Sequence, residues 1–299
     1  MSFYTETYTA PPSALLYMLK AFRPSSGWKP DHGFPDLNLI WRGYRIEPEA
    51  IRFLQRISGV QDGRSKELLF LLVPHVTGLR LLMAMLTHPL WPLPIWRALQ
   101  VRNRLSIHRH VKVGDTADLV TGVTAWRVLE KGIEVDLRTR LQQGDDWAWE
   151  SVVTFYYRGR FGSPTERGAA LGAAPMSPVL DDSSATAERW RIDGTDRWRF
   201  GALTGDYNGI HQWDLYARRF GFEAAFPHPQ RVAAQCLGRL GSSGSAPRQL
   251  DLWIKGPVYF GREVVLRQSP LENDRQDFAL WITGDERPAL VGSLYPLET

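Results

Sequence analysis

The chain contains 299 residues, 43% of them hydrophobic, and its 36 basic and 32 acidic residues leave a net charge of +4. This length suits two ordinary domains with cores of their own, and the composition excludes an intrinsically disordered chain. The nearly balanced charge predicts no nucleic-acid partner and no membrane-binding arm, and at most favours small anionic partners.

The N-terminus and the cysteine content indicate a reducing compartment. Residues 1–22 place Glu6 early and lack the basic-then-apolar order of a secretion signal. The single cysteine, Cys236, cannot form an intrachain disulfide and leaves a thiolate metal site short of ligands. We therefore expect a cytoplasmic protein without a metal ion or other cofactor.

The most apolar region, residues 68–96, raises the question of a membrane span. Arg80 lies near its middle, and prolines at positions 74, 89, 92 and 94 divide it into pieces. Each piece is shorter than the roughly 20 residues that a spanning helix needs. The pattern predicts no membrane partner but a buried helix, followed by an irregular aromatic loop, Trp91 to Trp96, that either lines a tunnel or fills the core.

Two segments of the chain have the pattern of β-hairpins. Residues 134–142 alternate apolar and charged side chains with period two, and a QGDD turn separates them from the aromatic and β-branched residues 147–157. Residues 277–283 and 289–295 flank the turn GDERP in the same way. Each hairpin follows an apolar helical segment, which indicates an α+β protein.

The chain also contains an internal repeat. Residues 44–60 align with residues 190–206 at a constant offset of 146, and residues 107–114 align with 254–261 at an offset of 147. Between them, Pro74-His75 matches Pro227-His228 at an offset of 153, and each dipeptide is expected to open a helix. Because the matches keep their order, we predict two copies, 1–158 and 188–299, joined by a linker, 159–187, that is rich in Gly, Ala, Ser and Pro.

Only the second copy carries a cluster of proton-transfer groups. The segment TGDYNGIH, residues 204–211, holds Asp206, Asn208 and His211. The alignment places Val60 opposite Asp206 and Ser65 opposite His211 in the first copy. A pair that merely stabilised the fold would be expected in both copies, so the difference predicts one working site per chain.

A carboxylate and an imidazole on one turn can share a water molecule, one accepting a proton as the other donates. The addition of water to an activated double bond, or the removal of water to form one, requires such a paired proton transfer. Asn208 could orient the loop, and Gly205 and Gly209 permit backbone angles that larger residues resist. By spacing alone, however, the segment is equally compatible with a polar surface turn, since Asp, Asn and Gly are ordinary turn residues.

Residues 200–217, FGALTGDYNGIHQWDLYA, resemble the hydratase-2 signature of the MaoC-like acyl dehydratases, the (R)-specific enoyl-thioester hydratases. The similar positions are an aromatic residue, Leu, Thr-Gly-Asp, Asn, Ile-His and an Ala six positions after the His. Residues 219–230 are similar to the Gly-Phe turn of the family and to the His that begins its central helix. The resemblance at motif level covers about residues 190–230.

This resemblance implies a double hot-dog fold, in which each of two repeats wraps an antiparallel sheet around a central helix. One half of such proteins commonly keeps the catalytic pair while the other accommodates the acyl chain. By position, Asp206 and His211 would activate or release water at the β-carbon of a 2-enoyl or (R)-3-hydroxyacyl thioester of coenzyme A or acyl carrier protein, in a hydro-lyase reaction. Asn208, Gly205 and Gly209 would support the loop. A homodimer is compatible with the sequence.

The chain departs from the family pattern at two positions. Gly209 stands where the family usually has Pro, and Pro229 stands where it typically has a Gly whose N–H holds the thioester oxygen. Since proline has no N–H, the remaining donors would be the backbone amides of Gln230 and Arg231 or the Arg231 side chain. His228 would either line the pocket or cap the helix. Two alternatives stay open: a thioesterase, since the same fold hosts both chemistries, and a catalytically impaired acyl-CoA-binding protein, because of Pro229.

Overall fold

A computed structural model describes residues 4–59, 64–111, 113–167, 176–180, 185–241 and 247–297 of the chain. Its strands are β1 (Tyr4–Tyr8), β2 (Leu37–Arg45), β3 (Leu99–Ile107), β4 (Thr116–Leu129), β5 (Gly132–Gln143), β6 (Asp146–Arg158), β7 (Thr165–Arg167), β8 (Thr186–Arg191), β9 (Arg248–Ile254), β10 (Glu263–Gln268), β11 (Gln276–Ile282) and β12 (Leu290–Pro296). Its helices are α1 (Ala14–Lys20), α2 (Pro48–Ser58), α3 (Arg64–Leu86), α4 (Arg197–Thr204), α5 (Asp214–Arg219) and α6 (Pro229–Leu237), with 3-10 turns η1 (Ile95–Arg97) and η3 (Gly209–His211).

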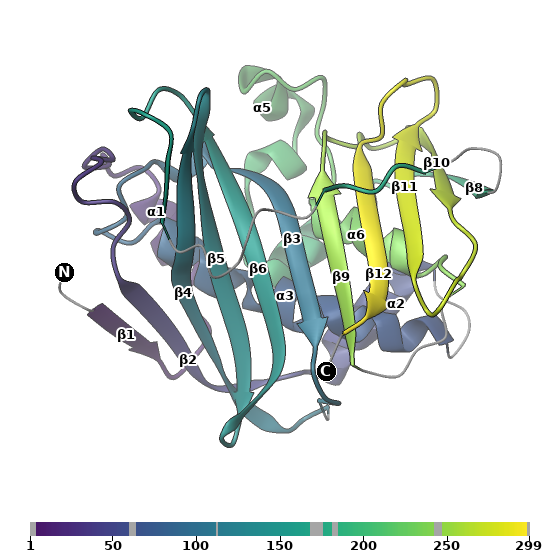
Figure 1. Ribbon diagram of the computed structural model, residues 1–299, viewed down its shortest axis with the longest axis horizontal. Coiled ribbons are helices and arrows are strands. Elements are labelled where there is room, and N and C mark those ends of the chain that lie inside the picture. Colours follow the sequence, from purple (N-terminus) through teal and green to yellow (C-terminus); the bar gives the residue numbers. More distant parts are fainter. Residues whose placement is uncertain are drawn as a thin grey trace.

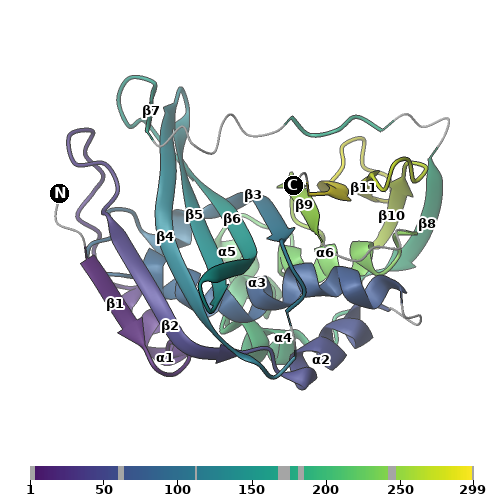
Figure 2. The same cartoon turned by 60° about the horizontal axis from the view of Figure 1, so that its bottom comes forward.

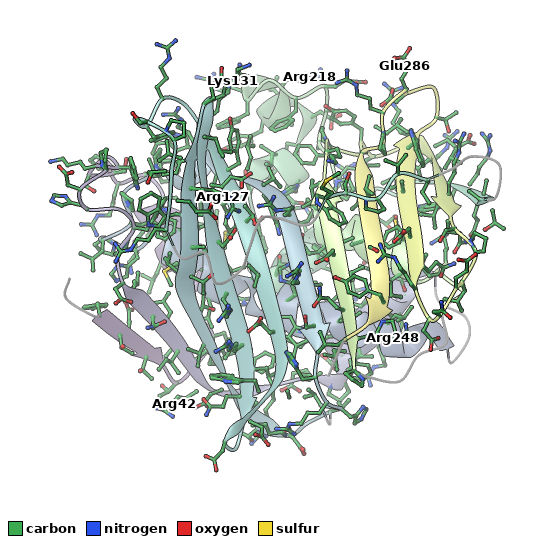
Figure 3. All side chains as sticks on the ribbon, viewed as in Figure 1. Arg42, Arg127, Lys131, Arg218, Arg248 and Glu286 are labelled. Carbon is green, nitrogen blue, oxygen red and sulfur yellow. The ribbon has the colours of Figure 1, made fainter. Side chains whose placement is uncertain are left out.

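Within the described residues, all the strands belong to one curved sheet of order β1-β2-β4-β5-β6-β3-β9-β12-β11-β10-β8, with β7 added beside β4. The helices lie on one face of this sheet (Figures 1 and 2). Charged side chains such as Arg127 and Arg248 lie over the opposite face (Figure 3). One apolar face packed on helices and one polar face is the usual arrangement of an antiparallel sheet.

Both predicted hairpins are confirmed. Strands β5 and β6 pair antiparallel, and so do β11 and β12. The period-two pattern sets which side chains are buried: Val135, Leu137 and Leu141 are fully buried in the core, while Arg138 and Arg140 form ion pairs on the other face. The sequence pattern therefore fixes the orientation of these strands.

The two halves of the sheet have the same strand order, β2-β4-β5-β6-β3 and β8-β10-β11-β12-β9. They join where β3 pairs antiparallel with β9. In that pairing Arg104 stands opposite Asp251, its equivalent at an offset of 147, and Nε of the arginine lies 2.9 Å from Oδ1 of the aspartate. A pseudo-twofold axis thus passes through the junction, as a duplicated fold requires.

The aligned glycines have the same conformation in both halves. Gly59 ends α2 with φ 75° and Gly205 ends α4 with φ 76°, both in the left-handed region that favours glycine at a helix C-terminus. Farther along, the amide of Gly114 donates to the carbonyl of Ile46, and the amide of Gly261 donates to the carbonyl of Ile192. The predicted α+β fold with two repeats is confirmed, and the sequence alignment identified equivalent positions.

The helices differ from the sequence expectation in the first half. Pro74-His75 was expected to open a helix, but α3 begins at Arg64 and continues through Pro74 to Leu86. The expectation that Pro74 divides this apolar region was therefore wrong, whereas the prolines at 89, 92 and 94 do follow the end of the helix, in the predicted irregular loop. A window of α3, Leu68–Leu86, is long and apolar enough to span a membrane, with a mean hydropathy of 1.8, yet 78% of it is buried inside the protein. Such burial is expected of the core helix of a soluble protein.

Part of the predicted linker is ordered against the outer face of the sheet. Strand β7 pairs with β4, and Leu180 packs against Trp253, Ala279 and Val291. The segment therefore covers some of the polar face that the helices leave open. The boundaries 1–158 and 188–299 themselves stay a prediction.

Candidate active site

The loop that carries Asp206 begins where α4 ends. Gly205 reverses the chain, and the amide of Asp206 then donates to Oγ1 of Thr204 at 3.0 Å. Oδ1 of Asp206 accepts a hydrogen bond from the amide of Asn208 at 2.9 Å. These local bonds use one carboxylate oxygen and leave Oδ2 to face the cavity described below.

Asn208 caps the short turn η3, its Oδ1 accepting from the amide of Ile210 at 3.2 Å. The turn presents His211, whose Nδ1 lies 2.8 Å from the carbonyl oxygen of Phe226. Because a carbonyl oxygen only accepts, Nδ1 carries a hydrogen, and Nε2 of the neutral ring has a free lone pair. The backbone carbonyl of Phe226 thus leaves Nε2 of His211 able to accept a proton.

Gly205 and Gly209 exclude larger residues for different physical reasons. Gly205 needs its positive φ, and a Cβ there would also lie only 2.8 Å from Cγ of Arg80. Gly209 has no such backbone angle, but a Cβ at this position would lie 2.6 Å from Cδ1 of Tyr216. The expectation of special backbone angles therefore holds for Gly205 and not for Gly209, where close packing is the cause.

The structure brings three titratable side chains together. Oδ2 of Asp206 lies 3.7 Å from Nε2 of His211 and 3.6 Å from Nε2 of His228. Both distances are too long for a direct hydrogen bond and leave room for a small shared ligand such as water. The Asp206 side chain keeps 14% of its surface exposed, which gives a ligand access.

His228 is the N-cap of α6, and its Nδ1 accepts from the amide of Gln230 at 3.5 Å. Burial, and secondarily the neighbouring His211, lower the pKa of His228 to about 4. The ring is therefore neutral at physiological pH. Because Nδ1 accepts from an N–H group, the hydrogen of the neutral ring resides on Nε2. This is the atom that points toward Asp206.

Most of the donors expected to replace the missing amide of Pro229 already have other partners, Nε of Arg231 being an exception. The amide of Arg231 donates to the carbonyl of His228 at 2.9 Å, while that of Gln230 donates to the His228 ring. The Arg231 guanidinium donates to the carbonyls of Thr195 and Asp193, at 2.7 and 3.1 Å. Among the described residues, neither Gln230 nor Arg231 lines the cavity, and the assignment of these groups to the thioester oxygen is corrected.

A cavity of about 1100 Å³ opens beside Asp206 and extends into the first half of the molecule. Its apolar wall includes Leu79, Met83 and Leu86 of α3, Ile95 and Trp96 around η1, and Phe155 of β6. Of the predicted aromatic loop, Ile95 and Trp96 thus line the tunnel. Trp91 is a core residue, its Nε1 donating to the Tyr157 hydroxyl at 3.2 Å.

Two residues that hydrogen-bond to the backbone just before Asp206 were not predicted from the sequence. The buried Tyr17 of α1 donates its hydroxyl hydrogen to the carbonyl of Gly205, 188 positions away. The Nη2 of Arg80 on α3 donates to the carbonyl of Ala202 at 2.7 Å. Both residues belong to the first half of the chain, and no local motif marks them.

The first half has no matching cluster among its described residues. His75, aligned with His228, lies inside α3, and Nε2 of Gln230 lies 2.8 Å from its Nε2. Burial, with a smaller effect of His228, lowers the pKa of His75 to about 3. Ser65, the position opposite His211, belongs to α3, and Val60 lies outside the described residues.

Comparison with known proteins gives consistent matches, although no family model matches the chain. The 3-hydroxyacyl-thioester dehydratase X of Mycobacterium tuberculosis is 25% identical over 195 residues, which span 65% of this chain and 66% of the relative, slightly under two thirds of its length. The crystal structure of HtdX from the same organism has a TM-score of 0.69 at 21% identity, covering 87% of this chain and 100% of that one.

A MaoC-like dehydratase from Phytophthora capsici has a crystal structure similar to this chain, with a TM-score of 0.60 at 16% identity, covering 71% of this chain and 76% of that one. At such identities the solved structures establish the fold. The curated relative and the motif of residues 200–217 add sequence similarity to it. In its fold and in this motif, the chain is similar to the MaoC-like dehydratases.

Proposed function

We propose that this protein is a hydro-lyase that adds water reversibly and (R)-specifically to 2-enoyl thioesters. One observation carries the proposal: Asp206 Oδ2 and His211 Nε2 face each other across 3.7 Å at the end of a large apolar cavity. This spacing suits a water molecule held by both groups, with the β-carbon of an acyl chain beside it.

In the hydration direction, Nε2 of His211 accepts a proton from the water while Asp206 Oδ2 orients its other hydrogen. The water oxygen bonds to the β-carbon, and the electron pair of the double bond moves onto the thioester carbonyl oxygen as an enolate. The α-carbon then takes the proton back from His211, which restores the carbonyl and the neutral imidazole. Dehydration follows the same steps in reverse, so the site ends each turnover unchanged.

The substrate class rests on the relative and on the cavity. The relative's name describes a 3-hydroxyacyl-thioester dehydratase, and the cavity of about 1100 Å³ lies at the upper end of small-ligand sites. We assign the acyl chain to the wall formed by α3 and the thioester to the region of α6, with coenzyme A or acyl carrier protein as carrier. A cytoplasmic location is consistent with the buried, free Cys236, and burial raises the pKa of its thiol to about 12.

A series of 2-enoyl-CoA substrates tests this function when both the enoyl absorbance and free thiol are followed. Loss of the double bond without thiol release is the expected result. Asp206→Asn should abolish that loss, with unchanged circular dichroism and unfolding midpoint. Thiol release would instead identify a thioesterase, and saturable binding with neither change would identify an acyl-binding protein.

A further inference from the structure

Hydration of an enoyl thioester develops negative charge on the carbonyl oxygen, and that oxygen needs a hydrogen-bond donor. Helix α6 points its N-terminus at the cavity, but its first residue, Pro229, has no N–H to offer. The next two amides are occupied by His228 itself, one by the ring and one by the carbonyl. A backbone oxyanion site is therefore absent from the described part of this helix start.

The two histidines of the site are hydrogen-bonded in opposite senses. Nδ1 of His211 faces the carbonyl oxygen of Phe226, which leaves Nε2 as a lone pair. Nδ1 of His228 faces the amide of Gln230, which leaves Nε2 as an N–H. Both Nε2 atoms lie within 4 Å of the same carboxylate oxygen, at 3.7 and 3.6 Å. The site thus presents one base and one donor near the same carboxylate oxygen of Asp206.

We propose that the Nε2–H of His228 is the donor that binds the thioester carbonyl oxygen and stabilises its enolate. This inference rests on the proposed function. The ring lines the cavity beside Pro229, and Oδ2 of Asp206, 3.6 Å from Nε2, is too distant to occupy the N–H. His228 transfers no proton: it donates a hydrogen bond while negative charge resides on the oxygen and keeps its hydrogen when the carbonyl re-forms.

The surroundings of His228 suit a neutral donor. The ring lies between the aromatic rings of Phe200 and His211, with centroids 5.9 and 5.2 Å away, and the residue is only 8% exposed. Its low pKa keeps it uncharged, so it stabilises the enolate without forming an ion pair with Asp206 beforehand.

The same three ligand atoms lie within 4.8 Å of one another, a spacing that a metal ion could also use. The hydrogen bond to Gln230 disfavours that use, because it places hydrogen on the atom that would have to ligate the ion. A role as hydrogen-bond donor needs no such rearrangement.

The kinetic test uses His228→Ala, His228→Ala with Pro229→Gly, and a matched control, His88→Ala. His88 also accepts from an amide two residues ahead, Leu90, but lies outside the cavity lining described here. We expect His228→Ala to lower kcat on the order of a hundredfold, the usual effect of losing one such donor. Pro229→Gly should restore much of that loss by supplying a backbone N–H. Wild-type turnover in His228→Ala, or loss without rescue, would overturn the inference.

A spectroscopic test does not depend on turnover. In the Asp206→Asn protein, bound trans-2-decenoyl-CoA labelled with ¹³C at the thioester carbonyl should show a carbonyl stretch at lower wavenumber than in Asp206→Asn with His228→Ala. Equal wavenumbers, or no bound carbonyl band, would contradict the role of His228. If the wild type consumes no enoyl thioester, the proposed function fails, while this wavenumber difference still decides what His228 does.

Discussion

The two halves of the molecule place the same dipeptide in different surroundings. In the second half Pro227-His228 precedes a short helix, so the His228 ring caps α6 and reaches the cavity. In the first half α3 starts earlier and runs through Pro74-His75, which turns His75 into a fully buried neighbour of Gln230. The longer helix α3 thus occupies the position that corresponds to the N-terminus of α6.

The difference shows how a duplicated fold can divide its work. The first half supplies the apolar wall of the cavity from Leu79, Met83 and Leu86, and it supports the catalytic loop through Tyr17. The second half supplies Asp206, His211 and His228. The cavity therefore combines an apolar wall from one half with the titratable side chains of the other.

Replacing the base, His211, and the buried histidine of the first half, His75, should separate the halves most strongly. His211→Ala is expected to lower kcat about a thousandfold, because general base catalysis contributes about 10²–10⁴. His75→Gln should leave kcat within a few-fold, since among the described residues His75 does not line the cavity. Steady-state kinetics on one enoyl-CoA checks both. A comparable loss of kcat in both variants would mean that the two halves do not differ in catalytic role.

Acid should destabilise the protein through the two buried histidines. The folded-state pKa values of His75 and His228, about 3 and 4, lie below the ordinary value of 6.5, so the unfolded chain binds protons first. Stability therefore falls as pH drops below 6.5 toward 4, at about 1.4 kcal/mol per pH unit for each histidine. Because the histidines of the unfolded chain are only half protonated at pH 6.5, where the slope is still small, the two together lose about 3 kcal/mol between pH 6.5 and 5.

Urea unfolding across this pH range measures the loss. His75→Gln should remove about half of the slope, because other titrating groups are common to both proteins. An unchanged slope in that variant would show that His75 does not stay neutral in the folded state.

Filling the first-half wall should change chain-length preference without changing the chemistry. Met83→Trp places a larger side chain in the cavity, so kcat/KM for long 2-enoyl chains should fall about 10- to 100-fold, as expected for a few methylenes that no longer fit. The four-carbon substrate, crotonyl-CoA, should be turned over as before. An equal effect on short and long chains would place the acyl chain elsewhere.

The smallest expected effect tests the contact of α1 with the catalytic loop. Tyr17→Phe removes one hydrogen bond to Gly205, worth about 1 kcal/mol, so kcat should fall about fivefold with little change in KM. The control Tyr156→Phe removes a similar hydroxyl-to-carbonyl bond, to Lys131, outside the described cavity lining. Equal effects in the two variants would mean that Tyr17 does not position the loop.

Sequence patterns were sufficient to predict those parts of the structure whose determining interactions are local in the chain. Period-two burial defined the hairpins, and the Gly59 and Gly205 caps gave the alignment of the halves its physical basis. The Asp206–Asn208–His211 segment is held largely by bonds within eight residues, which is why a motif could identify it.

The remainder depends on contacts between distant segments. Tyr17 reaches Gly205 from another repeat, and the carbonyl of Phe226 sets the hydrogen on His211. Pro74 was misread because a proline inside a helix is tolerated when tertiary packing holds the helix on both sides. The capping of the Gln230 amide by the His228 ring could be recognised only from the position of that ring.

Turnover of a 2-enoyl-CoA in H₂¹⁸O tests directly the proposal that Asp206 and His211 activate a water molecule between them. We expect ¹⁸O in the 3-hydroxyl group of an (R)-3-hydroxyacyl-CoA, formed by the wild type and not by Asp206→Asn or His211→Ala. Label in the carboxylate of a released acid, or equal label incorporation by the wild type and both variants, would contradict a hydration site built from these two side chains.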